Sequence, residues 1–269
     1  MWRREILPVY RREMKAYFTS PALYVAVGLF LGFVGLHFHS ILKMFAQFSQ
    51  EKMASQEAMY GGAPPANLTE FVVPRLFFLV AFLMLIVAPI ITMRLFSEEK
   101  RLGTFELLVT CPLRDWSILW GKYLAALTVG LIMLALCLIY PITVQYVSGW
   151  QAENAVIASS FLGLVLLVAA YMAFGVFASS VTENQMLSAV LTFVGLLSFY
   201  LIGVMDYGKG KRLWGADLAD ILGGVCLVVH GENFAKGMIS LIDVSFFFMF
   251  IAFFLIISAK ILEARRWRV

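Results

Sequence analysis

The sequence RLFSEEKRLGTFELL (residues 94–108) separates two long apolar runs, Phe71 to Met93 and Ile118 to Val147. Its first half is dense in charge, and its second half places apolar side chains at 105, 107 and 108 beside Glu106. That pattern favours a short amphipathic helix that lies on the membrane surface and offers one face to a cytosolic partner. A solvated loop that only obeys the topology rules is the alternative interpretation.

The composition around this stretch is typical of an integral membrane protein. Of the 269 residues, 61% are hydrophobic and 14% are charged, and a soluble domain of this length could not bury so much apolar surface. Apolar runs of about 20 residues cross a hydrocarbon core of about 30 Å as helices, which satisfy their own backbone hydrogen bonds. A β-barrel would instead show stretches of about 10 residues with alternating polarity. We therefore expect an all-α integral membrane protein.

Six transmembrane helices divide the chain, which we interpret as one transmembrane domain over residues 1–269. Pro89 and Pro141 are expected to kink the second and third spans, because proline removes a helix hydrogen bond. Leu213 to His230 is interrupted by two aspartates, so we interpret it as an outer re-entrant or interfacial helix before the sixth span. The six spans run from Ala22 to Leu42, Phe71 to Met93, Ile118 to Val147, Ala155 to Ser179, Gln185 to Met205 and Leu241 to Leu262.

Small residues recur along the fourth span, including Ala169, Ala173, Gly175 and Ser179. Small side chains allow the backbones of neighbouring helices to approach closely. The sequence leaves open whether this face packs within the chain or against a second copy.

The N-terminal segment predicts an amphipathic interfacial helix, because basic side chains alternate there with apolar ones. Membrane anchoring is favoured over partner binding as its role. Pro8 is expected to limit the regular helix to the residues that follow it. The apolar side chains recur every four residues, at Trp2, Ile6, Tyr10, Met14 and Phe18.

Lys and Arg side chains are unevenly distributed about the spans, and such asymmetry predicts orientation. With the N-terminus inside, 14 of the 21 basic residues fall in cytosolic segments and seven in outer segments. Both termini are therefore expected in the cytosol, and the net charge of +4 needs no nucleic-acid partner. The cytosolic set is Arg3, Arg4, Arg11, Arg12, Lys15, Arg94, Lys100, Arg101, Arg114, Lys122, Lys260, Arg265, Arg266 and Arg268. The outer set is Lys43, Lys52, Arg75, Lys209, Lys211, Arg212 and Lys236.

The chain shows no motif for chemistry of its own. It lacks G-x-x-x-x-G-K-[ST], of which Gly121-Lys122 is only a fragment, so we do not expect it to bind ATP. Its three cysteines have no paired spacing and are expected to be free thiols. His230 and Glu232 lie close in sequence, but no third ligand or catalytic partner can be named. No catalytic, cofactor-binding or metal-binding residue is assigned.

Ionisable residues are nearly absent from the interiors of the spans. Arg75, Arg94, Asp243 and Lys260 fall near span ends, where their side chains can reach the interface. A carrier driven by protons or sodium would usually place such residues at mid-membrane. Energy for any transport is therefore expected to come from outside the membrane.

Three motifs lie close together around the opening stretch: ITMRLFSEEKRLGTFELL (91–108), CPL (111–113) and WGKY (120–123). Together they resemble the signature of ABC type-2 exporter permeases. The resemblance covers essentially the whole chain, because both ends are similar to the gliding-motility-associated permease group. The terminal motifs are YFTSPALY (17–24), ENFAKG (232–237) and LEARRW (262–267).

The resemblance implies a six-span half-transporter in a bacterial cytoplasmic (inner) membrane. Two permeases, identical or homologous, would pair, and two separate ATP-binding subunits, which hold ATP and Mg, would dock beneath them. The connection between the second and third spans would insert into the ATPase as a cytosolic coupling helix, and residues 181–184 would make a smaller second contact. The residues that this implies for ATPase coupling are Glu98, Glu99, Arg101, Gly103, Thr104, Phe105, Glu106, Leu107, Leu108 and Glu183.

In this interpretation ATP binding closes the ATPase pair, and the permease shifts between arrangements that open to different sides of the membrane. Two other functions remain open. One is a mechanical membrane component that acts on a periplasmic protein without moving a substrate. The other is an integral-membrane enzyme acting on membrane lipid, for which no convergent polar groups can be assembled. The sequence names neither a substrate nor a direction of transport.

Overall fold

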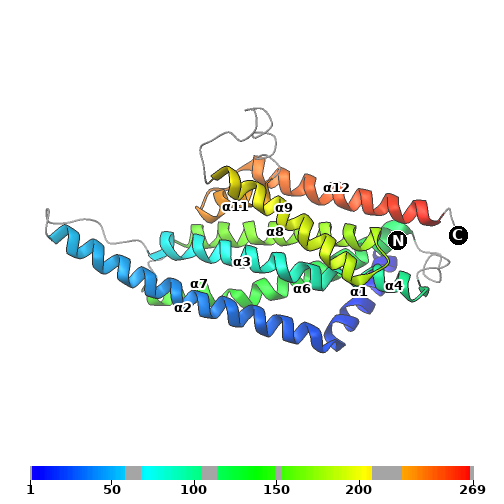
Figure 1. Cartoon of the computed structure of the whole chain (residues 1–269), viewed down its shortest axis with the longest axis horizontal. Helices are drawn as coiled ribbons and strands as arrows, with labels where there is room; N and C mark the ends of the chain where they lie inside the picture. The colour runs from blue at the N-terminus through cyan, green and yellow to red at the C-terminus, as the bar shows by residue number, and fades with distance from the viewer. Residues whose placement is uncertain (1, 58–67, 105–113, 149–152, 208–225, 267–269) are drawn as a thin grey trace.

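The computed structural model describes residues 2–57, 68–104, 114–148, 153–207 and 226–266, which form a bundle of helices without strands (Figure 1). Six helical stretches in these ranges are long and apolar enough to cross a membrane. They overlap all six predicted spans, so the all-α membrane architecture is confirmed. The stretches are Pro21–Glu51, Leu68–Arg101, Asp115–Tyr146, Asn154–Val181, Gln185–Ile202 and Leu241–Ala264.

The helices are, in chain order, α1 (Trp2–Thr19), α2 (Pro21–Glu57), α3 (Leu68–Thr92), α4 (Ser97–Arg101), α6 (Asp115–Cys137), α7 (Ile139–Val147), α8 (Asn154–Val181), α9 (Gln185–Tyr207), α11 (Leu227–Ala235) and α12 (Leu241–Arg266).

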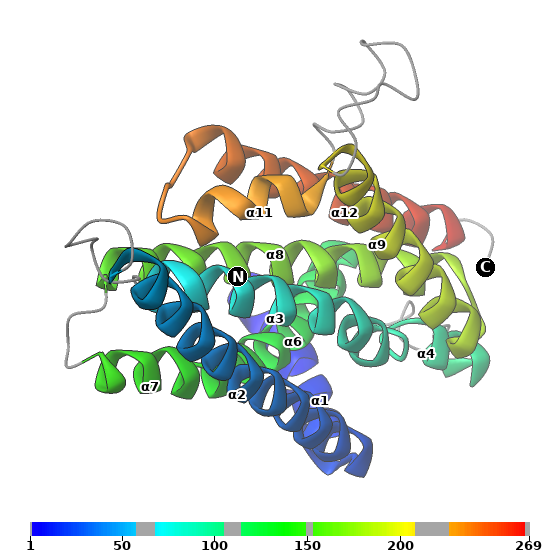
Figure 2. The ribbon, with the colours of Figure 1, turned by 60° about the vertical axis from the view of Figure 1, so that its left-hand side comes forward.

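Helix α8 is the centre of the bundle, where it packs against α3, α6, α9, α11 and α12 (Figure 2). Its glycines lie where neighbours come too close for a side chain. A Cβ on Gly175 would lie 2.7 Å from Cβ of Thr92 on α3, and one on Gly163 would lie 2.5 Å from Cβ of Phe234 on α11. The small residues of the fourth span therefore serve packing within the chain.

Aromatic rings fill the contact between α8, α9 and α12. The ring centroids of Phe174 and Phe254 are 4.9 Å apart, and those of Phe250 and Phe254 are 4.7 Å apart. Phe199 of α9 meets Phe250 edge-on at 5.4 Å. Aromatic pairs of this kind each add about 0.5–1.5 kcal/mol beyond the area they bury, so this cluster helps to hold α9 and α12 on the central helix.

Proline divides the third predicted span as expected. Helix α6 ends at Cys137 and α7 begins at Ile139, two residues before Pro141. Pro141 cannot donate to the carbonyl of Cys137, and the Leu138 amide turns to the carbonyl of Ala135 at 3.2 Å. Pro89 causes no such break, because α3 continues to Thr92.

The expectation for Pro8 is wrong. Helix α1 begins at Trp2 and includes Pro8 within its regular turns. Packing against α6 explains the difference, because the neighbouring Val9 is 6% exposed and lies against Gly121. Tertiary contacts therefore outweigh the one hydrogen bond that the proline removes.

Helix α11 lies beside α8, α9 and α12 at the end of the bundle opposite α4 (Figure 1). The sequence predicted a helix from Leu213 to His230 before the sixth span. The described helix, Leu227–Ala235, overlaps the end of this range and continues beyond it, and residues 208–225 lie outside the described part of the chain. Gly231 and Phe234 of α11 are buried, because this short helix packs into the bundle.

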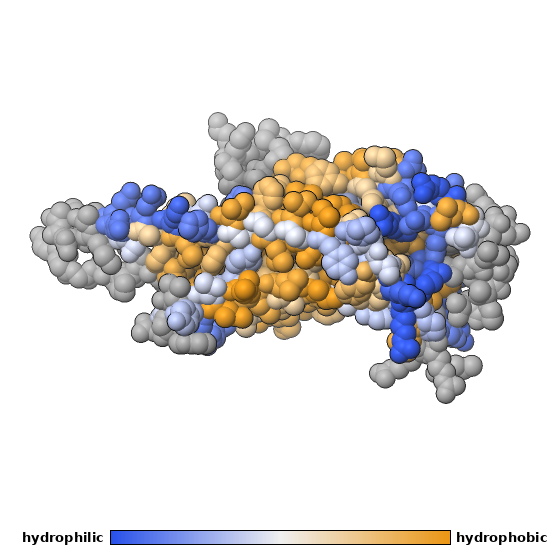
Figure 3. Space-filling view, turned by 90° about the horizontal axis from the view of Figure 1, so that it is seen from below, coloured by the Kyte–Doolittle hydropathy of each residue, from blue (hydrophilic) through white to orange (hydrophobic). Residues whose placement is uncertain are grey.

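The outer helices present apolar side chains to their surroundings, and the face seen from below in Figure 3 carries a broad hydrophobic band. Leu36 on α2 is 70% exposed and Met249 on α12 is 68% exposed. Helix α2 has 37 residues, or about 55 Å at about 1.5 Å per residue. It therefore projects beyond the bundle at the end opposite α4 (Figure 1).

Candidate functional site

Helix α4 and its neighbours form a charged cluster at one end of the bundle, where α12 also ends (Figure 1). The turn that leads into α4 is buried, with Leu95 and Phe96 1% and 0% exposed. Phe96 is the N-cap residue, and its side chain offers no hydrogen bond to the first turn. Instead, Ser179 Oγ of α8 accepts from the backbone N–H groups of Phe96 at 3.0 Å and Ser97 at 3.2 Å. A hydroxyl of α8 thus satisfies amides that have no partner within α4.

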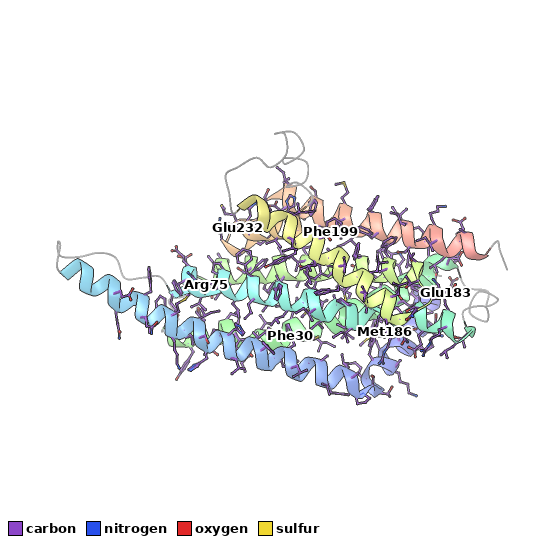
Figure 4. All side chains as sticks on the ribbon, viewed as in Figure 1. Phe30, Arg75, Glu183, Met186, Phe199 and Glu232 are labelled. Carbon is purple, nitrogen blue, oxygen red and sulfur yellow. The ribbon has the colours of Figure 1, made fainter. Side chains whose placement is uncertain are left out.

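A second contact joins α4 to the end of α8. The Lys100 ammonium donates to the backbone carbonyl of Ser180, in the last turn of α8. A cation is favoured there, because the terminal carbonyls give a helix C-terminus partial negative charge. Glu183 lies three residues further along, exposed in the connection to α9 (Figure 4).

The centre of the cluster is Lys122 of α6, whose side chain is 1% exposed. Its Nζ atom lies 2.9 Å from Oε1 of Glu13 on α1 and 3.0 Å from Oε1 of Glu99 on α4. It also donates to the backbone carbonyl of Leu95. An ammonium carries three N–H donors, so each of them faces an acceptor. Lys122 therefore links α1, α4 and the turn before α4 to α6.

Arg12 lies on the solvent side of this cluster, and 52% of its side chain is exposed. Its guanidinium contacts Glu13 at 2.7 Å and also reaches Glu99. Burial alone would raise the pKa of Glu13, but the charges and hydrogen bonds of Lys122 and Arg12 outweigh burial and lower that pKa. Glu13 is therefore ionised at neutral pH, and two cations balance two carboxylates.

Helix α1 reaches this cluster because it packs closely along α6. A Cβ on Gly121 would lie 2.8 Å from Cβ of Val9, so a larger residue at 121 would push α1 away. Hydrogen bonds lie on both sides of this contact. Ser117 Oγ donates to Glu5 at 2.8 Å, and Tyr10 Oη donates to Thr128 Oγ1 at 3.2 Å. Gly121 and Lys122 therefore both have structural roles. Gly121 lets α1 approach α6 closely, and Lys122 forms the ion pairs of the cluster.

Lys122 and Glu13 are not among the residues that the sequence predicts for this site. Lys122 is one of the predicted cytosolic cations, although it is the fifth residue of the third span as predicted from Ile118. A lone cation within an apolar run is costly unless it is paired, and that was the available signal. Its carboxylate partner could not be identified from the sequence, because Glu13 lies 109 residues away.

The residues predicted for ATPase coupling lie at the same end of the bundle where the structure describes them. Glu98 is partly buried, whereas Arg101 and Thr104 are exposed. Thr104 Oγ1 donates to the Glu99 carbonyl at 3.3 Å. Gly103 has a φ of 68°, in the left-handed region that glycine enters without strain. Four of the predicted residues lie outside the described part of the chain: Phe105, Glu106, Leu107 and Leu108.

A second polar cluster lies at the opposite end, between α11 and α12. Asp243 was expected to reach the interface, but it is 4% exposed. Its carboxylate accepts from His230 Nδ1 at 2.6 Å and from Asn233 Nδ2 at 2.8 Å. Phe246 stacks on the His230 ring with centroids 3.9 Å apart. Asp243 is therefore the partner of His230, which could not be identified from the sequence. Its hydrogen bonds hold α11 against α12.

Neither cluster has the composition of a metal centre, because no group of three or more His, Cys, Asp or Glu side chains gathers within the described ranges. The charged end instead combines buried ion pairs with an exposed polar surface, as suits a contact between proteins. Comparison with models of protein families gives one match. A family model described as "ABC-2 family transporter protein" matches residues 7–212. Comparison with curated proteins gives no match.

Proposed function

The chain belongs to the ABC-2 family of transporter proteins, and from this membership we propose that it is the permease half of an exporter driven by a separate ATP-binding subunit. In this proposal α4, the residues that follow it and Glu183 face that subunit from the cytosol. Both termini are cytosolic, a second permease completes the transporter, and the membrane is the bacterial inner membrane. Membership of the gliding-motility group stays a prediction.

The observation that carries this proposal is the attachment of α4 to three other helices. Through Glu99, Lys122 ties it to α6 and Arg12 ties it to α1, and Ser179 ties it to α8. A solvated connection would need none of these buried contacts. A force applied to α4 would instead reach α1, α6 and α8 together.

The exposed side of the same segment supports contact with a partner. Arg101 and Thr104 are exposed, and Leu102 between them is 61% exposed. Figure 4 shows Glu183 and Met186 close to this end of the bundle, and Met186 is 77% exposed. Apolar side chains within a charged rim are typical of the surfaces at which proteins associate.

The transport cycle follows from these attachments. ATP binding and hydrolysis take place in the partner subunit, whose closure would displace α4. Since packed helices shift between discrete arrangements and do not deform continuously, α1, α6 and α8 would move with α4. This chain thereby contributes the pathway through the membrane and the mechanical connection to it.

The test replaces Gly103 by proline. Proline fixes φ near about −65°, which is incompatible with the φ of 68° at Gly103. The Gly103→Pro variant should reach the membrane but retain less than about a tenth of the co-purifying ATP-binding subunit, a loss of about 1.4 kcal/mol or more. The matched control is Gly237→Pro, because Gly237 also has a positive φ, of 88°, at the opposite end. Equal retention of the ATPase by both folded variants would refute the assigned docking end.

One observation favours the mechanical alternative as a second candidate. Helix α2 projects beyond the bundle at the end opposite α4 (Figure 1), where a periplasmic protein could contact it. Two measurements on the ATPase-bound protein distinguish the alternatives: ATP-dependent transport of a substrate, and the requirement for a periplasmic partner. An exporter moves a substrate in an ATP-dependent manner across vesicles that contain only the transporter, whereas the mechanical component requires a periplasmic partner and moves no substrate.

A further inference from the structure

An apolar groove of about 230 Å³ opens between the corner that joins α1 to α2 and the C-terminal half of α6. The corner is fixed level with the end of α3, because Tyr17 Oη donates to the Ile91 carbonyl at 2.8 Å and Arg94 donates to Ser20 Oγ at 3.2 Å. The end of a membrane-spanning helix lies where headgroups meet acyl chains. The groove is lined by Phe18, Leu23, Tyr24, Val27, Val129, Ile132, Met133 and Leu136.

Two cationic side chains of α1 lie on the same side of this helix as Phe18, which lines the groove. Arg11, Lys15 and Phe18 are spaced by four and three residues, so they share one side of the helix. All three are exposed, and Phe18 lines the groove. Neither Arg11 nor Lys15 forms an ion pair within the described ranges. Figure 3 shows the hydrophilic surface of α1 beside the hydrophobic surface of the bundle.

The acidic residues of α1 do not neutralise these cations. Glu13 is committed to Lys122 and Arg12, and Glu5 accepts from Ser117. Arg94 adds a third positive charge on the other side of the corner, where it lines a smaller pocket of about 50 Å³ that shares Leu23 and Met133 with the groove. The site therefore has an apolar floor and a positively charged rim.

We propose that this groove binds an anionic phospholipid. One acyl chain lies between Val27 of α2 and Ile132 of α6, and the phosphate is held by Lys15 and Arg11. The apolar lining excludes a free hydrophilic anion, whereas the cations favour an anionic headgroup over a zwitterionic one. Each basic residue near a membrane surface strengthens the binding of anionic lipid about fivefold. The site is separate from the proposed ATPase contact, so it can be tested on this chain alone.

The first experiment measures headgroup selectivity by native mass spectrometry. The purified full chain in detergent is titrated with phosphatidylglycerol and with phosphatidylcholine of the same acyl chains. Phosphatidylglycerol should bind at least fivefold more tightly. The double variant Arg11→Gln/Lys15→Gln should lose this preference, because it should weaken phosphatidylglycerol binding at least fivefold more than phosphatidylcholine binding. The control Lys43→Gln/Lys260→Gln removes two exposed cations away from the groove and should keep the preference.

The second experiment blocks the groove without altering charge. Ile132→Trp places an indole in the groove and should weaken the binding of both lipids at least fivefold. Leu29→Trp is the matched control, because Leu29 is 63% exposed on α2 and does not line the groove. Three outcomes overturn the proposal: equal binding of both lipids to the wild type, a preference that survives the double variant, and displacement of phosphatidylglycerol by glycerol phosphate, which has no acyl chain.

Discussion

At the residue scale, the charged end depends on one buried lysine and its two carboxylates. Removing one partner from a buried ion pair is costly, because it leaves the other charge without compensation. Lys122 is that partner for both Glu13 and Glu99. An exposed pair contributes much less, and Lys260 with Glu263 provides such a pair on α12, at 2.8 Å.

We expect Lys122→Met to lower the thermal unfolding temperature of the detergent-solubilised protein, with a destabilisation of about 3 kcal/mol. Fluorescence-detected size exclusion after heating provides the measurement. Lys260→Met should change the midpoint by no more than the equivalent of about 0.5 kcal/mol. A Lys122→Met midpoint equal to that of the control would show that the cluster contributes nothing to stability.

Few of these contacts at the residue scale can be predicted from the sequence. The turn at Gly103, whose φ is 68°, is a feature that a sequence can reveal, because a glycine's conformational freedom is a local property. The ion pairs of Lys122 join segments that are far apart in the chain, so no local pattern reveals them. The same holds for Asp243 and His230, which only the packing of α11 on α12 brings together.

At the element scale, long apolar runs predicted the spans because length and hydropathy are local properties. The effect of Pro141 is also local, because the proline removes a hydrogen bond in its own turn. The helix therefore breaks at Leu138. The connection after the second span was harder to predict. The sequence favoured an amphipathic helix over Gly103 to Leu108, of which residues 105–108 lie outside the described part of the chain, and the described helix just before it is α4, Ser97–Arg101. Its cap comes from Ser179 of α8, and that long-range contact has no signature in α4 itself.

The cap can be tested by hydrogen exchange. Ser179→Ala removes the acceptor of the Phe96 and Ser97 amides and should destabilise the start of α4 by about 1 kcal/mol. Amide exchange in a peptide covering 93–101 should therefore accelerate about fivefold. Ser198→Ala is the control, because Ser198 is exposed and bonds only within α9. Unchanged exchange at 93–101 would mean that α8 does not hold α4.

At the scale of the whole molecule, the bundle has two unlike ends. The end with α1, α4 and the last turn of α12 is rich in charge, and the opposite end carries α11 and the projecting part of α2 (Figure 1). The excess of Lys and Arg predicts that the first end is cytosolic. All three cysteines, Cys111 and the buried Cys137 and Cys226, can be replaced by serine to give a background for labelling.

In that background, single cysteines should report the orientation in intact cells. A cysteine in place of Glu51 or Lys236 should react with an impermeant maleimide added outside, because both positions are exposed toward the α11 end. A cysteine in place of Arg101 or Glu183 should react only after the membrane is opened. External labelling at Arg101 would reverse the assigned orientation.

The central claim is that the exposed side of the α4 segment contacts a separate ATP-binding subunit. A photo-crosslinking residue in place of Leu102 tests it most directly, with Met238 as the matched position, because these apolar side chains are 61% and 55% exposed at opposite ends. The account predicts that irradiation joins the ATP-binding subunit to the chain from position 102 and not from position 238. Cross-linking from 238 alone, or from neither position in a complex that still hydrolyses ATP, would contradict it.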